Sequence, residues 1–165
     1  MRAIAQPGIE DLYREHALGL VRFALLLTRD RATAEDVVQD AFLGLHRHWD
    51  RVNDPGRVLA YLRSAVVNGS RSRHRRLLVA RRIYLEPRAP VPSAEASVLA
   101  VEDRKVLLAA IDALPRRQRE VLALKYFLDL GEHDIAEILG ISRGTVASTA
   151  SRALTALARL LREEP

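Results

Sequence analysis

A proline-rich segment near the middle of the chain interrupts an otherwise helical pattern of apolar residues. Residues 86–97 contain Pro87, Pro90 and Pro92 among alanine and serine. Proline lacks the backbone N–H and clashes with the preceding helical turn, so no regular helix is expected to cross this segment. The chain is therefore expected to fold as two separate helical parts.

The length of the chain fits two small domains and a short connection. It has 165 residues, which is enough for one ordinary domain or two small ones. We expect a first domain at residues 8–85, a linker at residues 86–100 and a second domain at residues 101–162.

Apolar residues at helical spacing predict three helices in the first part. The first runs from about Leu12 to Leu27, and the second has Thr33 as its predicted N-cap and ends near Trp49, before a loop. The third is expected to start at Pro55, a favoured first position, and to continue through Arg76.

The apolar pattern of the second part predicts four more helices and no strand. They are expected at residues 102–113, 116–127 and 132–139, with a final helix that Ser142 caps and that ends near Leu161. The expected fold class is therefore all-α, with two small helical domains.

The last two predicted helices have the pattern of a helix-turn-helix. Ala136 is small where two helices must pack closely, Gly140 can adopt the positive φ of the turn, and Val146 anchors the second helix. The start of such a second helix lies in the DNA major groove. An ordinary helical hairpin is the alternative. The residues expected nearest to DNA are Arg143, Gly144, Thr145, Ala147, Ser148, Ser151 and Arg152.

The third predicted helix and the residues after it carry a run of arginines. Residues 55–85 contain eight arginines and neither aspartate nor glutamate. Like charges one turn apart destabilise a helix, so the run favours an anionic partner such as nucleic acid. The net charge of +5 agrees with this. A solvated helix end is the alternative.

Acidic residues gather on the second predicted helix instead. Asp36 and Asp40 are four residues apart and share one helix face, which cannot contact DNA phosphates. This face is either simply solvated or presented to a protein partner.

Other functional classes lack support in the sequence. The absence of cysteine excludes disulfides and thiolate metal sites. His46 and His48 point to different faces of a helix, and there is no phosphate-binding glycine loop or nucleophile elbow. We expect no catalytic activity, metal, cofactor or small-molecule substrate. The apolar run at residues 18–27 is too short to span a bilayer, and the first residues do not form a signal peptide, so we expect a cytoplasmic protein without membrane insertion.

Three stretches, in order, resemble the extracytoplasmic-function sigma factors of the sigma-70 superfamily. Residues 34–42, AEDVVQDAF, are similar to the helix by which this family binds polymerase. Leu114 and Pro115 with residues 118–122, QREVL, resemble the start of its C-terminal domain. Residues 135–146, IAEILGISRGTV, resemble its promoter-reading helix-turn-helix.

The resemblance implies a promoter-recognition subunit with two partners, core RNA polymerase and promoter DNA. The polymerase would be bound through Asp36, Gln39, Asp40 and Phe42. The minus-ten element would be bound and melted by Tyr61, Arg63, Asn68, Arg71, Arg75 and Arg76. The minus-thirty-five element would be read by Arg119, His133 and the helix-turn-helix residues named above. An anti-sigma protein, which holds many relatives inactive, is a further candidate partner.

Two departures from the family pattern concern the recognition helix. Basic residues that are common in the family are replaced by Ala147 and Thr149. We therefore expect altered minus-thirty-five binding that depends more on Arg143 and Arg152. The alternatives are a dimeric stand-alone helix-turn-helix regulator and, less specifically, a protein that binds RNA or a membrane surface.

Overall fold

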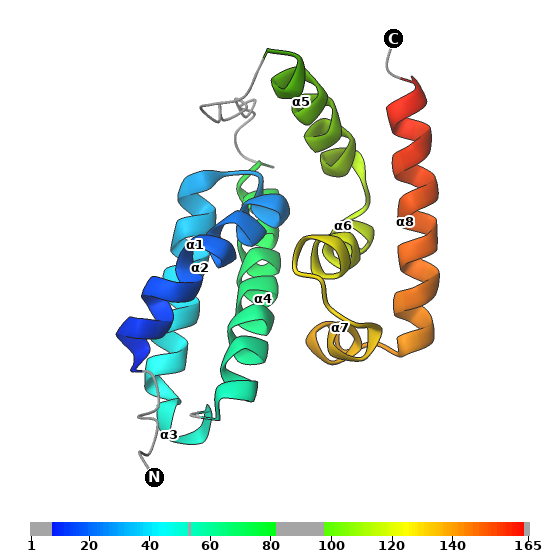
Figure 1. Cartoon of the computed structure of the whole chain (residues 1–165). Coiled ribbons are helices and arrows are strands. Elements are labelled where there is room, and N and C mark those ends of the chain that lie inside the picture. The colour runs from blue at the N-terminus through cyan, green and yellow to red at the C-terminus, as the bar shows by residue number, and fades with distance from the viewer. Residues whose placement is uncertain (1–7, 53, 82–97, 164–165) are drawn as a thin grey trace. The chain divides into compact units, whose positions relative to one another are not determined.

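The structure, a computed structural model, describes residues 8–52, 54–81 and 98–163. These residues are helical and contain no strand, and the chain divides into two compact units at residues 1–84 and 85–165 (Figure 1). The prediction of an all-α fold is confirmed. Residues 86–97 of the predicted linker lie outside the described residues, and the exact domain bounds stay a prediction.

Unit 1 is a bundle in which α1, α2 and α4 pack on one another (Figure 1). The helices are α1 (Ile9–Thr28), α2 (Arg31–Arg47), the short α3 (Trp49–Val52) and α4 (Pro55–Arg81). Each long helix contributes apolar side chains at helical spacing to one buried core. The largest of them are Phe23, Val37, Val38, Leu45, Leu62, Val66 and Val67.

Gly69 allows α4 to approach α2 closely. A Cβ atom on Gly69 would lie 3.0 Å from Cγ1 of Val37, a distance tighter than nearly all real contacts. Val37 is itself buried and β-branched, so it has little room to move. The side chains of α4 one turn beyond Gly69 are therefore within reach of the outer surface of α2.

The start of α2 differs from the prediction that Thr33 is its N-cap. Asp30 is the N-cap, and its carboxylate accepts a hydrogen bond of 2.8 Å from the backbone N–H of Thr33. Thr33 is instead the third residue of the helix and also donates its hydroxyl to Asp30. A carboxylate is the better cap because it accepts both bonds and carries the charge that the positive helix start favours. The loop predicted after Trp49 is also wrong in part, because α3 occupies its first residues.

Unit 2 contains α5 (Val98–Ala113), α6 (Arg116–Leu122), the π-helical turn η1 (Ala123–Phe127), α7 (Glu132–Leu139) and α8 (Arg143–Glu163). Leu114 and Leu122 form a buried cluster with Ala153 of α8, and Ala156, Leu157 and Leu160 of α8 pack against it. The break at Leu114 and Pro115 is as predicted. The predicted helix at residues 116–127 is α-helical only through Leu122. Its last residues form a π-helical turn, in which the backbone N–H of Leu128 donates to the carbonyl of Ala123.

The turn between α7 and α8 has the predicted conformation. Gly140 has φ of 65°, in the left-handed region that glycine adopts without strain. The hydroxyl of Ser142 accepts a hydrogen bond of 3.1 Å from the backbone N–H of Thr145, so Ser142 caps α8. Val146 and Ala150 are buried behind the turn, and the start of α8 is thereby fixed against α7.

Candidate nucleic-acid and protein-binding surfaces

The outer face of α2 carries three of the four residues predicted to bind polymerase. Asp36, Gln39 and Asp40 are exposed, and their spacing places them on one side of the helix. Leu43 continues this row one turn later and is 55% exposed. Leu43 was not among the predicted polymerase-binding residues, although its position three residues after Asp40 places it on the same side of the helix. We call the row of Asp36, Gln39, Asp40 and Leu43 the α2 face.

Phe42 does not belong to this exposed row. It is buried in unit 1, and its ring meets that of Tyr13 edge-on with 4.9 Å between the ring centroids. Such a contact holds α1 against α2 beneath the exposed residues. Direct contact of Phe42 with a partner stays a prediction.

Arg73 of α4 lies against the acidic end of the α2 face. Its Nη2 donates to Oδ2 of Asp40 at 3.1 Å, and its Nη1 contacts Oδ2 of Asp36 at 3.5 Å. The two carboxylates remain 65% and 56% exposed. One guanidinium therefore joins both acidic side chains without covering them.

The six residues predicted to bind the minus-ten element all lie on α4. Asn68, Arg75 and Arg76 are exposed, while Tyr61, Arg63 and Arg71 are half-buried. The ring of Tyr61 lies next to α2, with its centroid 6.4 Å from that of His48. An exposed amide, an aromatic ring and several guanidinium groups on one helix can bind phosphates and stack on bases.

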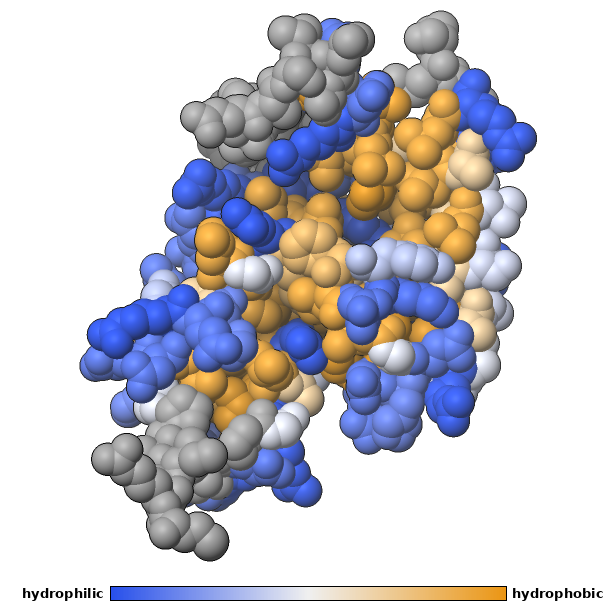
Figure 2. Space-filling view, in the orientation of Figure 1, coloured by the Kyte–Doolittle hydropathy of each residue, from blue (hydrophilic) through white to orange (hydrophobic). Residues whose placement is uncertain are grey.

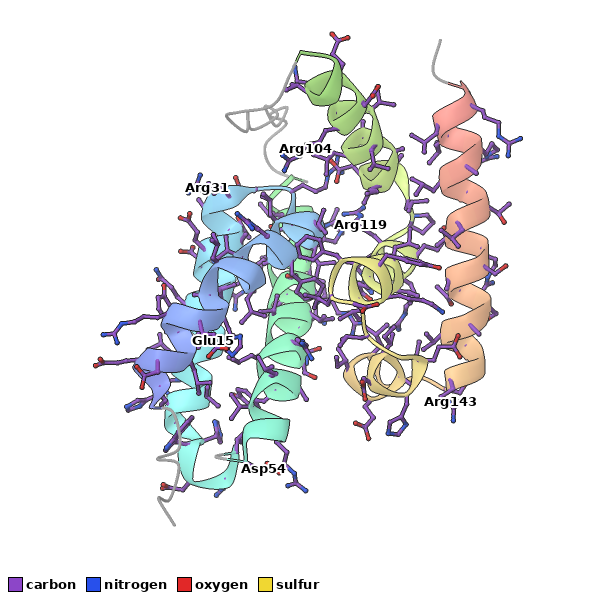
Figure 3. All side chains as sticks on the ribbon, in the orientation of Figure 1. Glu15, Arg31, Asp54, Arg104, Arg119 and Arg143 are labelled. Carbon is purple, nitrogen blue, oxygen red and sulfur yellow. The ribbon has the colours of Figure 1, made fainter. Side chains whose placement is uncertain are left out.

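The seven residues predicted at the DNA-facing side of the helix-turn-helix are all exposed on α8, and their contact with DNA stays a prediction. The buried residues between them are Val146, Thr149 and Ala150. Arg143 lies in the first turn of α8, at the end of the helix that follows α7 (Figure 3). This turn presents both a cation and the helix start, an arrangement that attracts phosphate.

Thr149 bears on the prediction of altered DNA binding. It is only 3% exposed, so a basic residue at this position would start from the buried side of α8. Its hydroxyl is 3.5 Å from Nη2 of Arg152, whose Nε donates to the carbonyl of Ser148 at 3.3 Å. Ala147, by contrast, is exposed. Of the two departures from the family pattern, Ala147 is the one that changes the outer surface of the helix.

Arg119 and His133 have different surroundings. Nη2 of Arg119 donates to the carbonyls of Asp112 and Leu114, both at 3.1 Å, and so binds the C-terminal end of α5 (Figure 3). Cations are favoured at helix C-termini, where carbonyls lack partners. His133 is exposed on α7, with its Nε2 3.8 Å from Oε1 of Glu137. DNA contact by either residue stays a prediction.

Unit 2 also exposes apolar side chains that the sequence patterns did not predict to be exposed. Leu107 and Leu108 of α5, Leu154 of α8, and Tyr126 and Phe127 of the π-helical turn are each at least 38% exposed. Figure 2 shows apolar surface over α5 and α8 in this view.

The described residues contain no group of three or more histidine and acidic side chains that could hold a metal ion. No helix in the described part is both long and apolar enough to cross a bilayer.

Comparison with known proteins assigns both units. Residues 12–78 match the family profile described as Sigma-70 region 2, and residues 104–157 match Sigma-70, region 4. The chain is 34% identical over 157 residues to the ECF RNA polymerase sigma factor SigL of Mycobacterium tuberculosis, covering 92% of this chain and 88% of SigL. It is 32% identical over 150 residues to the RNA polymerase sigma-E factor of Streptomyces avermitilis, covering 90% and 82%.

A solved structure shares the architecture. The sigma factor RpoE of Bartonella quintana, solved in complex with the anti-sigma factor NepR, matches with a TM-score of 0.73 at 27% identity. The match covers 94% of this chain and 99% of that one.

Proposed function

This chain belongs to the sigma-70 family as a sigma factor of the extracytoplasmic-function type that directs transcription initiation, and we propose that its two units divide this work between polymerase and promoter. The observation that carries the proposal is the presence of region 2 and region 4, in that order, on one short chain. A stand-alone helix-turn-helix regulator would leave region 2 without a role.

In this proposal the α2 face binds core RNA polymerase. The face combines two carboxylates, an amide and an exposed leucine on one side of a helix that is fixed in the bundle by Phe42 and its neighbours. An exposed leucine at the end of a row of acidic groups suits a protein partner with basic side chains. It does not suit DNA, whose phosphates would be repelled.

Promoter DNA is bound by α4 and α8. Tyr61 and Asn68, with Arg63, Arg71, Arg75 and Arg76 of α4, bind the minus-ten region and stabilise its unstacked bases. Unstacking costs a few kcal/mol per base step, and these contacts offset that cost. The exposed side of α8 enters the major groove of the minus-thirty-five element as duplex DNA, with Arg143 nearest to the bases. The domain bounds at residues 8–85 and 101–162 and the linker at residues 86–100 form part of the proposal.

The mechanism uses binding energy to deform DNA and needs no covalent chemistry, so we propose a regulatory protein and not an enzyme. A protein that works on bacterial RNA polymerase acts in the cytoplasm. The relative from Bartonella quintana was solved with an anti-sigma factor, and we extend that class of partner to this chain as a third candidate.

The test is co-elution of the purified chain with active core RNA polymerase. The wild type is expected to bind, and the double variant Asp36→Arg/Asp40→Arg is expected to lose binding because it reverses the charge of the α2 face. Glu10→Arg/Asp11→Arg makes the same change of charge on exposed residues of α1 and is the matched control.

Each outcome of this experiment has a distinct meaning. Loss in the α2 double variant alone supports the proposed binding face. Equal binding by all three proteins would move the polymerase contact away from α2, and failure of the wild type to bind would overturn the proposed function itself.

A further inference from the structure

The side chain of Arg73 on α4 contacts a neighbouring helix. The run was expected to serve DNA, but the guanidinium of Arg73 extends to α2 and contacts Oδ2 of both Asp36 and Asp40. Gly69 explains this reach. It lies one turn earlier on the same side of α4, where the two helices are close enough that a Cβ atom on Gly69 would lie 3.0 Å from Cγ1 of Val37.

We propose that Arg73 is a positioning residue of the polymerase-binding face: it fixes Asp36 and Asp40 in the geometry that binds the polymerase and does not itself contact the promoter. This inference rests on the proposed role of the α2 face. Two carboxylates one turn apart repel each other and sample several rotamers when they are exposed. A guanidinium between them removes the repulsion and holds both side chains by directed hydrogen bonds.

The contacts leave the carboxylates able to bind a partner. Arg73 uses only the Oδ2 atom of each, and a carboxylate can accept about four hydrogen bonds. More than half of each carboxylate side chain is exposed, whereas Arg73 is 34% exposed. Two negative charges and one positive charge leave the cluster with a net charge of −1. An arginine that blocked the face would instead cover the acidic oxygens.

Pre-ordered side chains lower the conformational entropy that is lost when the partner binds. For two aspartates we expect Arg73→Gln to weaken the affinity for core polymerase about fivefold. The loss should be in the dissociation rate, because removing a positive charge from an acidic face does not slow association with a basic partner.

The test measures association and dissociation of the full chain with core RNA polymerase. Arg73→Lys keeps the charge but not the planar fork, so it should recover part of the loss. Arg57→Gln makes the same change of charge at an exposed position in the first turn of α4 and is expected to match the wild type. With polymerase at saturation, promoter opening by the Arg73→Gln protein should equal that of the wild type.

A double variant that lacks both carboxylates separates the positioning role of Arg73 from a general effect on folding. In an Asp36→Asn/Asp40→Asn chain, Arg73→Gln should cause no further loss, because its partners are no longer charged. A loss that persists in this background would overturn the inference, and so would tighter binding by Arg73→Gln, or unchanged affinity with slower promoter opening. If the Asp36→Asn/Asp40→Asn chain bound polymerase as well as the wild type, the proposed face and the inference would fall together.

Discussion

The hydroxyl oxygen of Tyr61 lies 2.7 Å from the position that a Cβ atom on Gly44 would occupy, so this aromatic side chain of α4 rests directly on the backbone of α2. The lack of a Cβ atom on Gly44 thus leaves the space that the ring of Tyr61 occupies. The sequence alone assigned Tyr61 to the minus-ten region by resemblance, and gave no indication that a glycine of another helix positions it.

Substitution of Gly44 should therefore displace Tyr61 and slow promoter melting. Gly44→Ala brings a methyl group into contact with the phenol, and the ring must tilt away. Since stacking of a base on an aromatic ring contributes about 1–3 kcal/mol, partial loss of alignment should slow opening of the minus-ten region about threefold. The measurement is the rate of open-complex formation by reconstituted holoenzyme, followed with a fluorescent base analogue.

Gly19→Ala is the control for this prediction. Gly19 is an exposed residue of α1, and a Cβ atom there has no neighbour within 4 Å. The Gly19→Ala substitution should stabilise the chain by about 0.5–1 kcal/mol and leave promoter opening unchanged. Normal opening by Gly44→Ala would show that the position of the ring on α2 does not matter.

The helices were largely predictable because their signals are local. The break at Pro115, the positive φ of Gly140 and the cap at Ser142 each follow from the chemistry of one residue. The N-cap of α2 was harder to predict, because two nearby residues suit this position. Asp30 and Thr33 are both good caps, and only the structure shows that Asp30 accepts the bonds.

Features that depend on two helices were not predictable from local patterns. The bridge from Arg73 to Asp36 and Asp40 needs the register of α4 against α2, and the arginine run gave no reason to single out one member. Arg119 likewise resembled its neighbours in sequence, yet it binds the end of α5. The π-helical turn at Ala123–Phe127 has no signal in helix propensity, because its residues suit an α-helix equally well.

Removal of the buried carboxylate of Glu120 should destabilise unit 2. Glu120 is 2% exposed and lies within 3.8 Å of Arg116 and Arg117. Buried charges depend on their partners, so Glu120→Gln should cost about 2 kcal/mol of stability. Thermal unfolding followed by circular dichroism reports both units, whereas fluorescence of Trp49, the single tryptophan, reports unit 1.

The matched control is Glu137→Gln on α7, because Glu137 is 70% exposed and its contact with His133 is at the surface. This variant should change the stability by less than about 0.5 kcal/mol. Equal effects of the two substitutions on the free energy of unfolding would mean that the burial of Glu120 does not contribute to stability.

Loss of the cap at Ser142 should loosen the first turn of α8. Ser142→Ala removes the acceptor for the backbone N–H of Thr145, at a cost of about 1 kcal/mol. Hydrogen exchange of the Thr145 amide should accelerate about fivefold, and affinity for minus-thirty-five DNA should fall. Ser142→Asp restores a cap but adds a negative charge beside DNA, so it should restore slow exchange without restoring affinity. Recovery of both would contradict the placement of DNA at this turn.

Arg143 should carry more of the minus-thirty-five affinity than any other cation on the exposed side of α8. Ala147 offers no charge there, and Arg152 is held at its own helix by Ser148 and Thr149. Arg143→Ala should weaken binding about tenfold, because a bidentate contact to guanine contributes about 1–3 kcal/mol. Arg162→Ala, in the last turn of the same helix, should have little effect. The measurement is binding of holoenzyme to promoter fragments with intact and scrambled minus-thirty-five elements, which distinguishes base reading from phosphate contact.

A loss of affinity confined to the intact element indicates base reading. An equal loss on both fragments, with the slope of log affinity against log salt concentration lower by about 1, indicates a phosphate contact. Unchanged protection of the minus-thirty-five element in both Arg143→Ala and Arg152→Ala would show that α8 reads DNA through another part of its surface.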